Sequence, residues 1–228
     1  MPFRPSAEDC ELLARDGYAI VAGLLDDAAC DSLLAQVAAL EGTEPRRLLD
    51  AEPIARLARE LAMHPGLAPL LPRDAVALQC TCFDKSPSRN WSVGPHQDLS
   101  LPLPDDVDAV PAGWRGASRK DGMLFAQPPA QLLDQVCAVR LQLDEAAGGD
   151  GALEVIPGTH RRGRLGPAEL AELAESATRV ACRVPRGAAL VLHPLLVHGS
   201  RKLRTGGRRR VLHFVFAPAD IAAPGLAA

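Results

Sequence analysis

Six short runs of mainly apolar residues, separated by segments that contain glycine and proline, recur along the chain from residue 75 onward. They constrain the fold more than any other feature. The runs are AVALQCTCF, VCAVRLQLDE, ALEVIPGTH, TRVACRVP, AALVLHPLLVHGS and RRVLHFVFA. Runs of this length bounded by chain breakers are typical of β-strands, and one segment among them, GPAELAELAES, has a helical pattern. The succession of short strands predicts a sandwich or a barrel.

The first 74 residues have a helical character instead. Helical segments are predicted at 6–17, 26–40 and 52–64. In the first of these, Ser6 is the expected N-cap and Gly17 the expected C-cap, and a short strand is expected at 18–25. A chain of 228 residues can bury a sizeable core. We therefore predict one α+β domain, mainly β, with a helical part at 1–74 and a strand-rich core at 75–217.

The stretch 99–130, LSLPLPDDVDAVPAGWRGASRKDGMLFAQPPA, is rich in proline and glycine and is predicted to be a long loop. Loops of this length in compact domains are usually functional or disordered. This one follows directly after His96 and Asp98, two residues with metal-binding chemistry. We therefore expect it to be an active-site loop.

Composition narrows the class of protein. Hydrophobic residues make up 47% of the chain and the net charge is −3, so neither nucleic acid nor a membrane is an expected partner. The six cysteines form no CxxC pair, which argues against a zinc knuckle or a thioredoxin motif. We expect a cytoplasmic protein, since neither a signal-peptide pattern nor an apolar run of about 20 residues is present. The basic stretch 201–210, RKLRTGGRRR, is interpreted as a solvated loop with one buried arginine.

His96 and Asp98 stand two positions apart in GPHQDLSLPL, inside a proline-bounded apolar stretch. Residues i and i+2 of a strand point to the same face, so both side chains can reach one metal ion if the segment is extended. The alternative is a histidine beside an ordinary loop aspartate. A metal site would need a third ligand, an imidazole or a carboxylate, from a neighbouring strand.

His198 is the strongest candidate for that third ligand. It ends the run VLHPLLVHGS, precedes a glycine and leads into a loop, where sites tend to form. His64 and His160 lie at a helix end and in a turn, and His193 and His213 lie inside apolar runs, where a satisfied core histidine is more common. Two histidines and one carboxylate are the ligand set of non-haem Fe(II) oxygenases, whereas zinc more often recruits three histidines or cysteines.

Residues 75–217 resemble the phytanoyl-CoA dioxygenase family of Fe(II)- and 2-oxoglutarate-dependent oxygenases. Three blocks carry the resemblance, in the family's order: PHQDLSLPL, GALEVIPGTHRRGRL and HPLLVHGSRKLRTGGRRRVLHFVFA. The resemblance implies a double-stranded β-helix, a cupin-like jelly-roll of two sheets with the metal at its mouth and helices from the N-terminal part. It also implies Fe(II) as cofactor, 2-oxoglutarate as cosubstrate, and O2.

By this match His96, Asp98 and His198 are the expected iron ligands and catalytic residues. The family places an arginine eleven residues after the distal histidine, which is Arg209 in this chain. Its guanidinium group suits the far carboxylate of 2-oxoglutarate, because the planar fork makes two parallel hydrogen bonds. Strand alternation is expected to turn the two flanking arginines to the opposite face.

The resemblance also assigns four further residues to the cosubstrate. Ser200 is expected to donate its hydroxyl to the same carboxylate, and Thr81 to line the cosubstrate pocket. Trp114, eighteen residues after His96, falls where the family has a tryptophan near the cosubstrate. Gln97 belongs to the motif, although a regular strand would turn it away from the iron.

The implied function is hydroxylation of an unactivated C–H bond of a small-molecule metabolite, with release of succinate and CO2. A halogenase is a less favoured alternative, because halogenases of this kind lack the carboxylate ligand and this chain has Asp98. A jelly-roll protein that binds metal or ligand without turnover is the second alternative, and the presence of all four residues, His96, Asp98, His198 and Arg209, argues against it. The substrate (a CoA thioester, an amino-acid derivative or another metabolite) and the oligomeric state stay open.

Overall fold

The computed structural model describes residues 7–222 except 41, 43, 108, 146–150 and 205. The helices are α1 (Ala7–Asp16), α2 (Asp27–Ala39), α3 (Glu52–Met63), α4 (Ala130–Leu133), α5 (Pro167–Ser176) and α6 (Ala219–Ala222), with short 3-10 helices η1 (Leu48–Asp50), η2 (Ala68–Leu70) and η4 (Thr159–Arg162). The three expected N-terminal helices are confirmed, and Gly17 follows α1 at a φ of 84°, while Ser6 lies outside the described residues. None of the helices described is long and apolar enough to cross a membrane.

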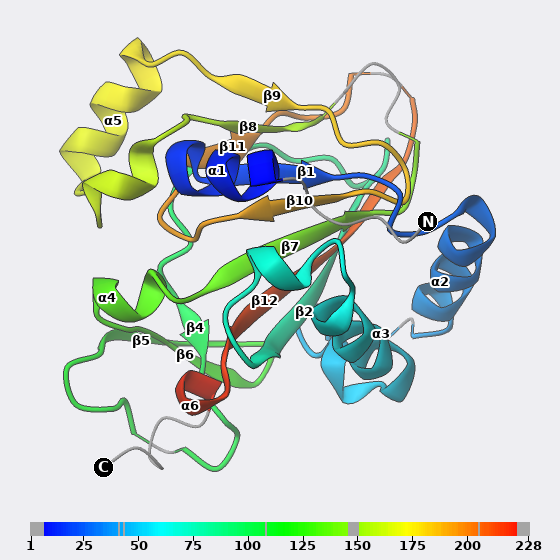
Figure 1. Ribbon diagram of the computed structural model, residues 1–228, viewed down its shortest axis with the longest axis horizontal. Coiled ribbons are helices and arrows are strands. Elements are labelled where there is room, and N and C mark those ends of the chain that lie inside the picture. The colour runs from blue at the N-terminus through cyan, green and yellow to red at the C-terminus, as the bar shows by residue number, and fades with distance from the viewer. Residues whose placement is uncertain are drawn as a thin grey trace.

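The main sheet has five antiparallel strands in the order β1-β10-β7-β12-β2 (Figure 1). These strands are β1 (Tyr18–Val21), β2 (Ala75–Lys85), β7 (Cys137–Gln142), β10 (Ala189–Leu192) and β12 (Arg209–Pro218). Strand β1 comes from the helical N-terminal part, yet it pairs with β10 at the edge of this sheet. The N-terminal part therefore contributes a strand to the core as well as helices.

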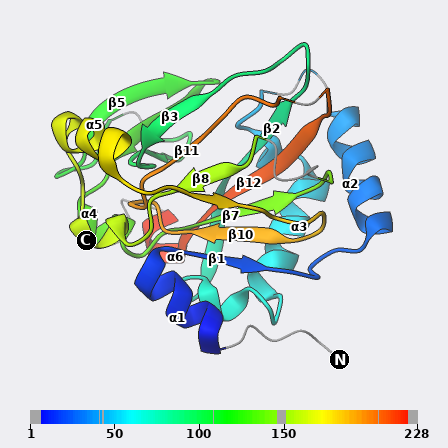
Figure 2. The ribbon, with the colours of Figure 1, turned by 90° about the horizontal axis from the view of Figure 1, so that it is seen from above.

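A second antiparallel sheet has the order β3-β11-β8-β9, of which β3, β11 and β8 can be followed in Figure 2 and β9 in Figure 1. Its strands are β3 (Val93–His96), β8 (Leu153–Val155), β9 (Val180–Cys182) and β11 (His198–Ser200). The two sheets pack against each other through one apolar cluster, in which Leu153 and Val155 of the second sheet meet Ala138 and Leu190 of the first. Two facing antiparallel sheets with helices outside form the expected jelly-roll core.

Alternation along β12 gives the main sheet a helix-facing side and an inner side. Leu212 and Phe214 are fully buried in the largest apolar cluster, together with Ile54 and Leu57 of α3. Helix α3 presents its apolar residues at helical spacing and covers this side (Figure 1). His213, between those two residues of β12, points to the inner side, where the second sheet lies. Polar side chains on the inner side are thus held between the two sheets.

The prediction of a long loop at 99–130 is wrong for much of that stretch. This stretch contains β4 (Leu101–Pro102), β5 (Arg115–Lys120) and β6 (Met123–Gln127), which form a third antiparallel sheet in the order β4-β6-β5. Asp121 and Gly122 connect β5 to β6 at φ values of 51° and 76°. An Asp-Gly pair with both residues at positive φ is the preferred two-residue hairpin turn. The Asp-Gly pair could have predicted this hairpin, but the high proline and glycine content of the region favoured the prediction of a loop.

The run AALVLHPLLVHGS, expected to be one strand, forms two strands in different sheets. Strand β10 ends at Leu192, the chain turns through Pro194, and β11 begins at His198. Proline has no N–H for the sheet and ends the first strand here. His198 therefore begins a strand of the second sheet, where we expected it to leave a sheet for a loop.

Candidate metal centre

His96 and His198 come from neighbouring strands of the second sheet and lie side by side. His96 ends β3 and His198 begins β11, and the two residues are direct partners in the antiparallel register. Their ring centroids are 4.4 Å apart. Direct partners of an antiparallel pair project from the same face, so the strand pairing itself brings the two imidazoles together.

Asp98 completes the group just beyond the end of β3. Its backbone N–H donates to the carbonyl of Pro194 at 2.9 Å, which fixes the chain where β10 leads into β11. One carboxylate oxygen lies 3.6 Å from Nε2 of His96, and the other lies 3.5 Å from Nε2 of His198. The ligand atoms of the three side chains all lie within 4.8 Å of one another. Within the described part of the chain, no other group of three or more histidine, cysteine or acidic side chains meets this condition.

Both histidines present the same ring nitrogen to this group. Nδ1 of His96 lies 2.9 Å from the carbonyl oxygen of Gly94, and Nδ1 of His198 lies 2.9 Å from that of Leu196. A carbonyl oxygen only accepts hydrogen bonds, so each Nδ1 carries a proton, and Nε2 is the ring nitrogen that faces the other ligands and could bind a metal. Metal-binding histidines typically have this second hydrogen bond, which fixes the orientation of the ring.

The electrostatics of Asp98 and His198 favour their metal-binding forms. Burial would lower the pKa of His96, but the carboxylate of Asp98 outweighs burial and raises it. Burial alone would raise the pKa of Asp98, but His198 and His96 outweigh it and hold that pKa far below its ordinary value. Burial lowers the pKa of His198. The site therefore offers a carboxylate and a neutral imidazole near neutral pH, which are the protonation states that a metal ion requires.

A cavity of about 160 Å³ adjoins the three residues on the side toward β11 and β12. Three basic residues from three strands of the main sheet line it: Lys85 of β2, Arg140 of β7 and Arg209 of β12. The one acidic residue that lines it is Asp98. A small cavity with this balance of charge suits an anionic ligand, because opposite charges attract strongly where water is scarce.

Arg209 faces this cavity and its neighbours in the sequence do not. Arg208 makes two hydrogen bonds to the carboxylate of Asp84, and Arg210 makes two to the carboxylate of Asp144. Arg209 is buried, lines the cavity and donates to the carbonyl of Gly151. The alternation that we predicted for the three arginines is present.

A family model described as Phytanoyl-CoA dioxygenase (PhyH) matches residues 13–211, most of the chain. The chain belongs to the phytanoyl-CoA dioxygenase family. A curated relative, the peroxisomal phytanoyl-CoA dioxygenase of Homo sapiens, is 31% identical over 110 residues, which cover 42% of this chain and 31% of the relative. The match to this relative therefore spans less than a third of the relative's length.

Solved structures of similar fold agree with the jelly-roll architecture. Apo HygX from Streptomyces hygroscopicus has a TM-score of 0.67 at 19% identity, covering 95% of this chain and 88% of that one. SnoK, a non-heme alpha ketoglutarate dependent carbocyclase from nogalamycin biosynthesis, has a TM-score of 0.69 at 16% identity, covering 96% and 87%. Another HygX structure contains nickel, 2-oxoglutarate and hygromycin B, with 19% identity, a TM-score of 0.64 and coverage of 94% and 88%. At such low identity these structures establish the fold.

Ser200, one of the residues that the family resemblance assigned to the cosubstrate, lines the cavity in this family member. Its hydroxyl oxygen accepts from Nζ of Lys85 at 3.0 Å, and the same ammonium donates to the carbonyl of Arg201 at 2.8 Å. The ammonium also lies 5.3 Å from the ring centroid of Trp91. Lys85 and Ser200 therefore form one polar group next to Arg209.

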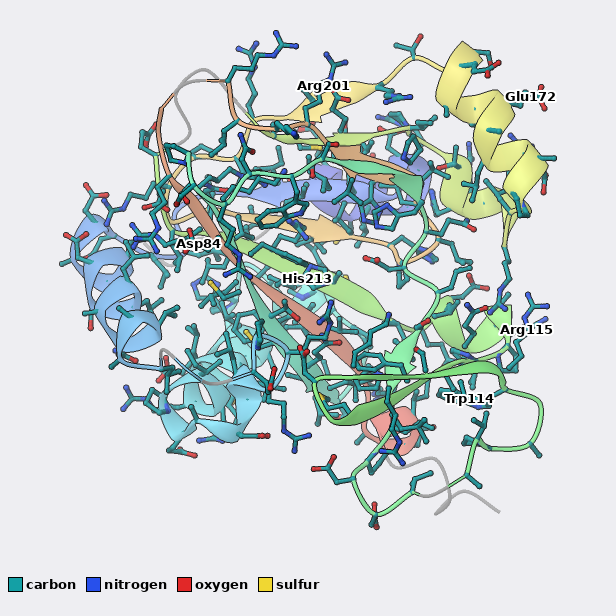
Figure 3. All side chains as sticks on the ribbon, turned by 180° about the vertical axis from the view of Figure 1, so that it is seen from behind. Asp84, Trp114, Arg115, Glu172, Arg201 and His213 are labelled. Carbon is teal, nitrogen blue, oxygen red and sulfur yellow. The ribbon has the colours of Figure 1, made fainter. Side chains whose placement is uncertain are left out.

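Trp114 lies elsewhere than we expected. It packs against the apolar cluster of Leu101 and Leu133, and it lines neither cavity beside the three candidate ligands. Figure 3 shows it beside the β5–β6 hairpin, away from His213 near the middle of the main sheet. The tryptophan that lines the 160 Å³ cavity is Trp91. The register of the hairpin, which the sequence did not define, made a count of residues from His96 unreliable.

Gln97 and Thr81 also lie apart from the Arg209 cavity. The side-chain amide of Gln97 donates to the carbonyls of Gly163 and Leu195 and accepts from the N–H of Leu165. These three backbone bonds give Gln97 a structural role. Thr81 and Gln97 line a second cavity, of about 320 Å³, which is also lined by His96 and Asp98. Neither residue has the contacts of a cosubstrate ligand in the first cavity.

Sequence reasoning missed Arg140, Lys85 and His213. We interpreted His213 as a core histidine, but it lines both cavities, and its Nδ1 lies 3.0 Å from Nη1 of Arg140. Burial lowers the pKa of His213 to about 3, so its ring is neutral. One signal was available: Arg140 interrupts the apolar strand CAVRLQ, and a charged residue inside a buried strand requires a partner or a ligand.

Gly199, in the middle of β11, controls how closely the two histidine-bearing strands approach. A Cβ at this position would lie 2.7 Å from the carbonyl oxygen of Val93, a backbone atom of β3. Gly199→Ala is therefore expected to push β3 and His96 away, to lower the free energy of unfolding by about 1–3 kcal/mol, and to weaken metal binding. Metal titration and thermal unfolding check this against Gly206→Ala, where nothing lies within 4 Å of the added carbon. Wild-type values in Gly199→Ala would contradict the expectation.

Proposed function

We propose that this protein is an Fe(II)- and 2-oxoglutarate-dependent dioxygenase that hydroxylates a C–H bond of a small molecule. The observation that carries the proposal is the combination of two structural features. Nε2 of His96, Nε2 of His198 and the carboxylate of Asp98 converge on one point, and a small cavity lined with basic residues opens beside that point. Two imidazoles and one carboxylate with open positions are the ligand set of non-haem Fe(II) oxygenases.

The donor set fits ferrous iron. The two imidazoles and one carboxylate would hold the ion, and the contacts of both Nδ1 atoms with backbone carbonyls already orient the rings. Bound iron supplies the reaction of O2 with 2-oxoglutarate that yields succinate and CO2 and oxidises the substrate. Asp98 would fill the third ligand position, which favours hydroxylation over halogenation.

The residues around the 160 Å³ cavity would hold 2-oxoglutarate. Arg209 offers its guanidinium fork to the far carboxylate, and Ser200 and Lys85 stand beside it with a hydroxyl and an ammonium group. Charge-assisted hydrogen bonds of this kind contribute roughly 1.5–3 kcal/mol each. The apolar walls, which include Phe83 and Leu153, would exclude water from the reacting end of the molecule.

The second cavity, of about 320 Å³, would receive the small-molecule substrate. His96 and Asp98 line it but Arg209 does not, and it extends toward β6 and the loop before η1, where Phe125 and Arg46 line it. Structural relatives bind metabolites as different as hygromycin B and nogalamycin RO, and they include a carbocyclase and an epimerase. We choose hydroxylation because the resemblance to the family implies it and because Asp98 argues against halogenation.

Turnover of 2-oxoglutarate distinguishes an oxygenase from a binding protein of the same fold. Fe(II)-loaded protein is expected to consume O2 and to form succinate in equal amounts when 2-oxoglutarate and a pool of candidate metabolites are supplied. Zinc-loaded protein serves as the control, because zinc occupies the ligands without redox chemistry. Tight binding of iron and 2-oxoglutarate with no succinate across the pool would favour the binding-protein alternative.

The affinity for 2-oxoglutarate is expected to fall as the pH rises above about 8. Burial, followed by the charges of Arg209 and Arg140, lowers the pKa of Lys85 to about 8. The ammonium is present below that pH and attracts the anion. Above that pH the free protein loses the proton of Lys85, and binding of the anion must restore it. The affinity is therefore expected to fall by up to about tenfold per pH unit, until the pH exceeds the pKa that Lys85 has in the complex. Calorimetric titration at about pH 7 and about pH 9 checks this, with Lys85→Met expected to bind more weakly but to vary less with pH. Equal wild-type affinities at the two pH values would contradict it.

A further inference from the structure

Arg140 lies in the interior of β7 and projects toward the second sheet. Its register partners are Leu190 of β10 and His213 of β12. Nη1 lies 3.0 Å from Nδ1 of His213, and the guanidinium carbon lies 5.0 Å from the ring centroid of Phe83. The side chain is thus held in place by a neutral histidine and an aromatic ring.

Arg140 forms no ion pair with any carboxylate of the described residues. Other arginines of the sheet differ in this respect, since Arg208 and Arg210 each make two hydrogen bonds to an aspartate. An arginine in the protein interior is normally paired, because an uncompensated charge there is costly. Burial and the charge of Arg209 lower the pKa of Arg140 to about 10, which still leaves the side chain charged near neutral pH. Its counter-ion is therefore expected to come from the cavity that it lines.

The two arginines occupy different ends of that cavity. Arg209 begins β12, whereas Arg140 lies beside His213, four residues further along the same strand. His213, whose Nδ1 lies 3.0 Å from Nη1 of Arg140, lines both cavities that reach His96 and Asp98. Arg140 thus lies at the end toward the metal ligands, and Arg209 lies at the end toward Lys85 and Ser200.

We propose that Arg140 binds the carboxylate of 2-oxoglutarate that adjoins the keto group, at the metal end of the cavity. Arg209 and Arg140 would then hold the two carboxylates of one dianion. This assignment rests on the proposed function, and it makes a specific statement about the ligand. A 2-oxo monocarboxylate would keep the contact with Arg140 and lose the contact with Arg209.

Variants and a truncated ligand together test this assignment. Calorimetry with nickel-loaded protein measures the affinities of 2-oxoglutarate and of 2-oxopentanoate, which lacks the far carboxylate. Arg140→Met is expected to lower the affinity for both acids by the same factor, about ten- to a hundredfold. Arg209→Met is expected to lower the affinity for 2-oxoglutarate by a similar factor and to leave the affinity for 2-oxopentanoate unchanged. Arg208→Met, on the surface, is the matched control and should change neither.

Two further measurements keep the outcomes distinct. Nickel content and thermal unfolding show whether each variant is folded and holds its metal. If Arg140→Met fails to fold, Arg140→Lys replaces it, because lysine keeps the charge but lacks the guanidinium fork. A loss confined to 2-oxoglutarate in the Arg140 variant, or no loss at all, would overturn the assignment while leaving the proposed function intact. Failure of the wild-type protein to bind either acid would overturn the proposed function itself and this assignment with it.

Discussion

His198→Ala is expected to abolish stoichiometric Fe(II) binding. His198 is buried, its Nε2 lies 3.5 Å from the carboxylate of Asp98, and its ring lies beside that of His96. Removing the imidazole leaves two ligands, one of them a carboxylate whose nearest remaining partner is a single histidine. Loss of a residue that only orients a ligand costs about 10–100-fold in metal affinity, so loss of a ligand should cost roughly a hundredfold or more. Metal analysis after anaerobic loading measures this directly.

The controls for this experiment are the other histidines. His64→Ala, at the end of α3, and His193→Ala, which removes a ring whose Nε2 lies 3.6 Å from the carboxylate of Asp134, are expected to keep one iron per chain. His96→Ala should lose iron as His198→Ala does. Full iron content in His198→Ala, with loss in His193→Ala, would mean that the metal lies elsewhere than the point on which His96 and Asp98 converge.

Arg209→Ala is expected to bind metal normally and 2-oxoglutarate at least ten- to a hundredfold more weakly. Arg209 lines the same cavity as the three candidate ligands. The expected loss corresponds to one or two charge-assisted hydrogen bonds at roughly 1.5–3 kcal/mol each, and about 1.4 kcal/mol corresponds to a factor of ten in the dissociation constant. Calorimetric titration of 2-oxoglutarate into nickel-loaded wild-type and variant protein provides the numbers.

The flanking arginines are matched controls for charge. Arg208→Ala removes an exposed ion pair with Asp84, and Arg210→Ala removes a partly buried ion pair with Asp144. Both variants lower the net charge by the same amount as Arg209→Ala, so all three have the same long-range electrostatic effect. Equal losses of 2-oxoglutarate affinity in the three variants would indicate a diffuse basic patch and contradict a specific role for Arg209.

The candidate metal ligands could be predicted because their geometry is local. Two residues at i and i+2 at a strand end share a face whatever the rest of the fold does, which placed His96 beside Asp98. The position of Arg209 followed from strand alternation in the same way, and the ion pairs of its neighbours agree with it. His198 needed the family pattern, because spacing alone does not tell which strand becomes the partner of β3.

The rest of the site depends on contacts between strands far apart in the sequence. Arg140 and His213 are neighbours only because β7 pairs with β12, and Lys85 reaches Arg209 only because β2 pairs with β12. The pattern of residues within one strand does not predict which strand pairs with it or in which register. The wrong prediction for Trp114 has the same cause. A count of residues along the chain placed Trp114 near the cosubstrate, whereas the structure packs it against Leu101 and Leu133.

Titration of 2-oxoglutarate into metal-loaded and metal-free protein tests most directly whether metal and cosubstrate share one site. If the keto acid lies between the three candidate ligands and Arg209, nickel-loaded protein should bind one equivalent. Metal-free protein should bind it more weakly by more than about tenfold, or 1.4 kcal/mol. Equal affinity with and without metal would contradict the account, because it would place the anion away from His96, Asp98 and His198.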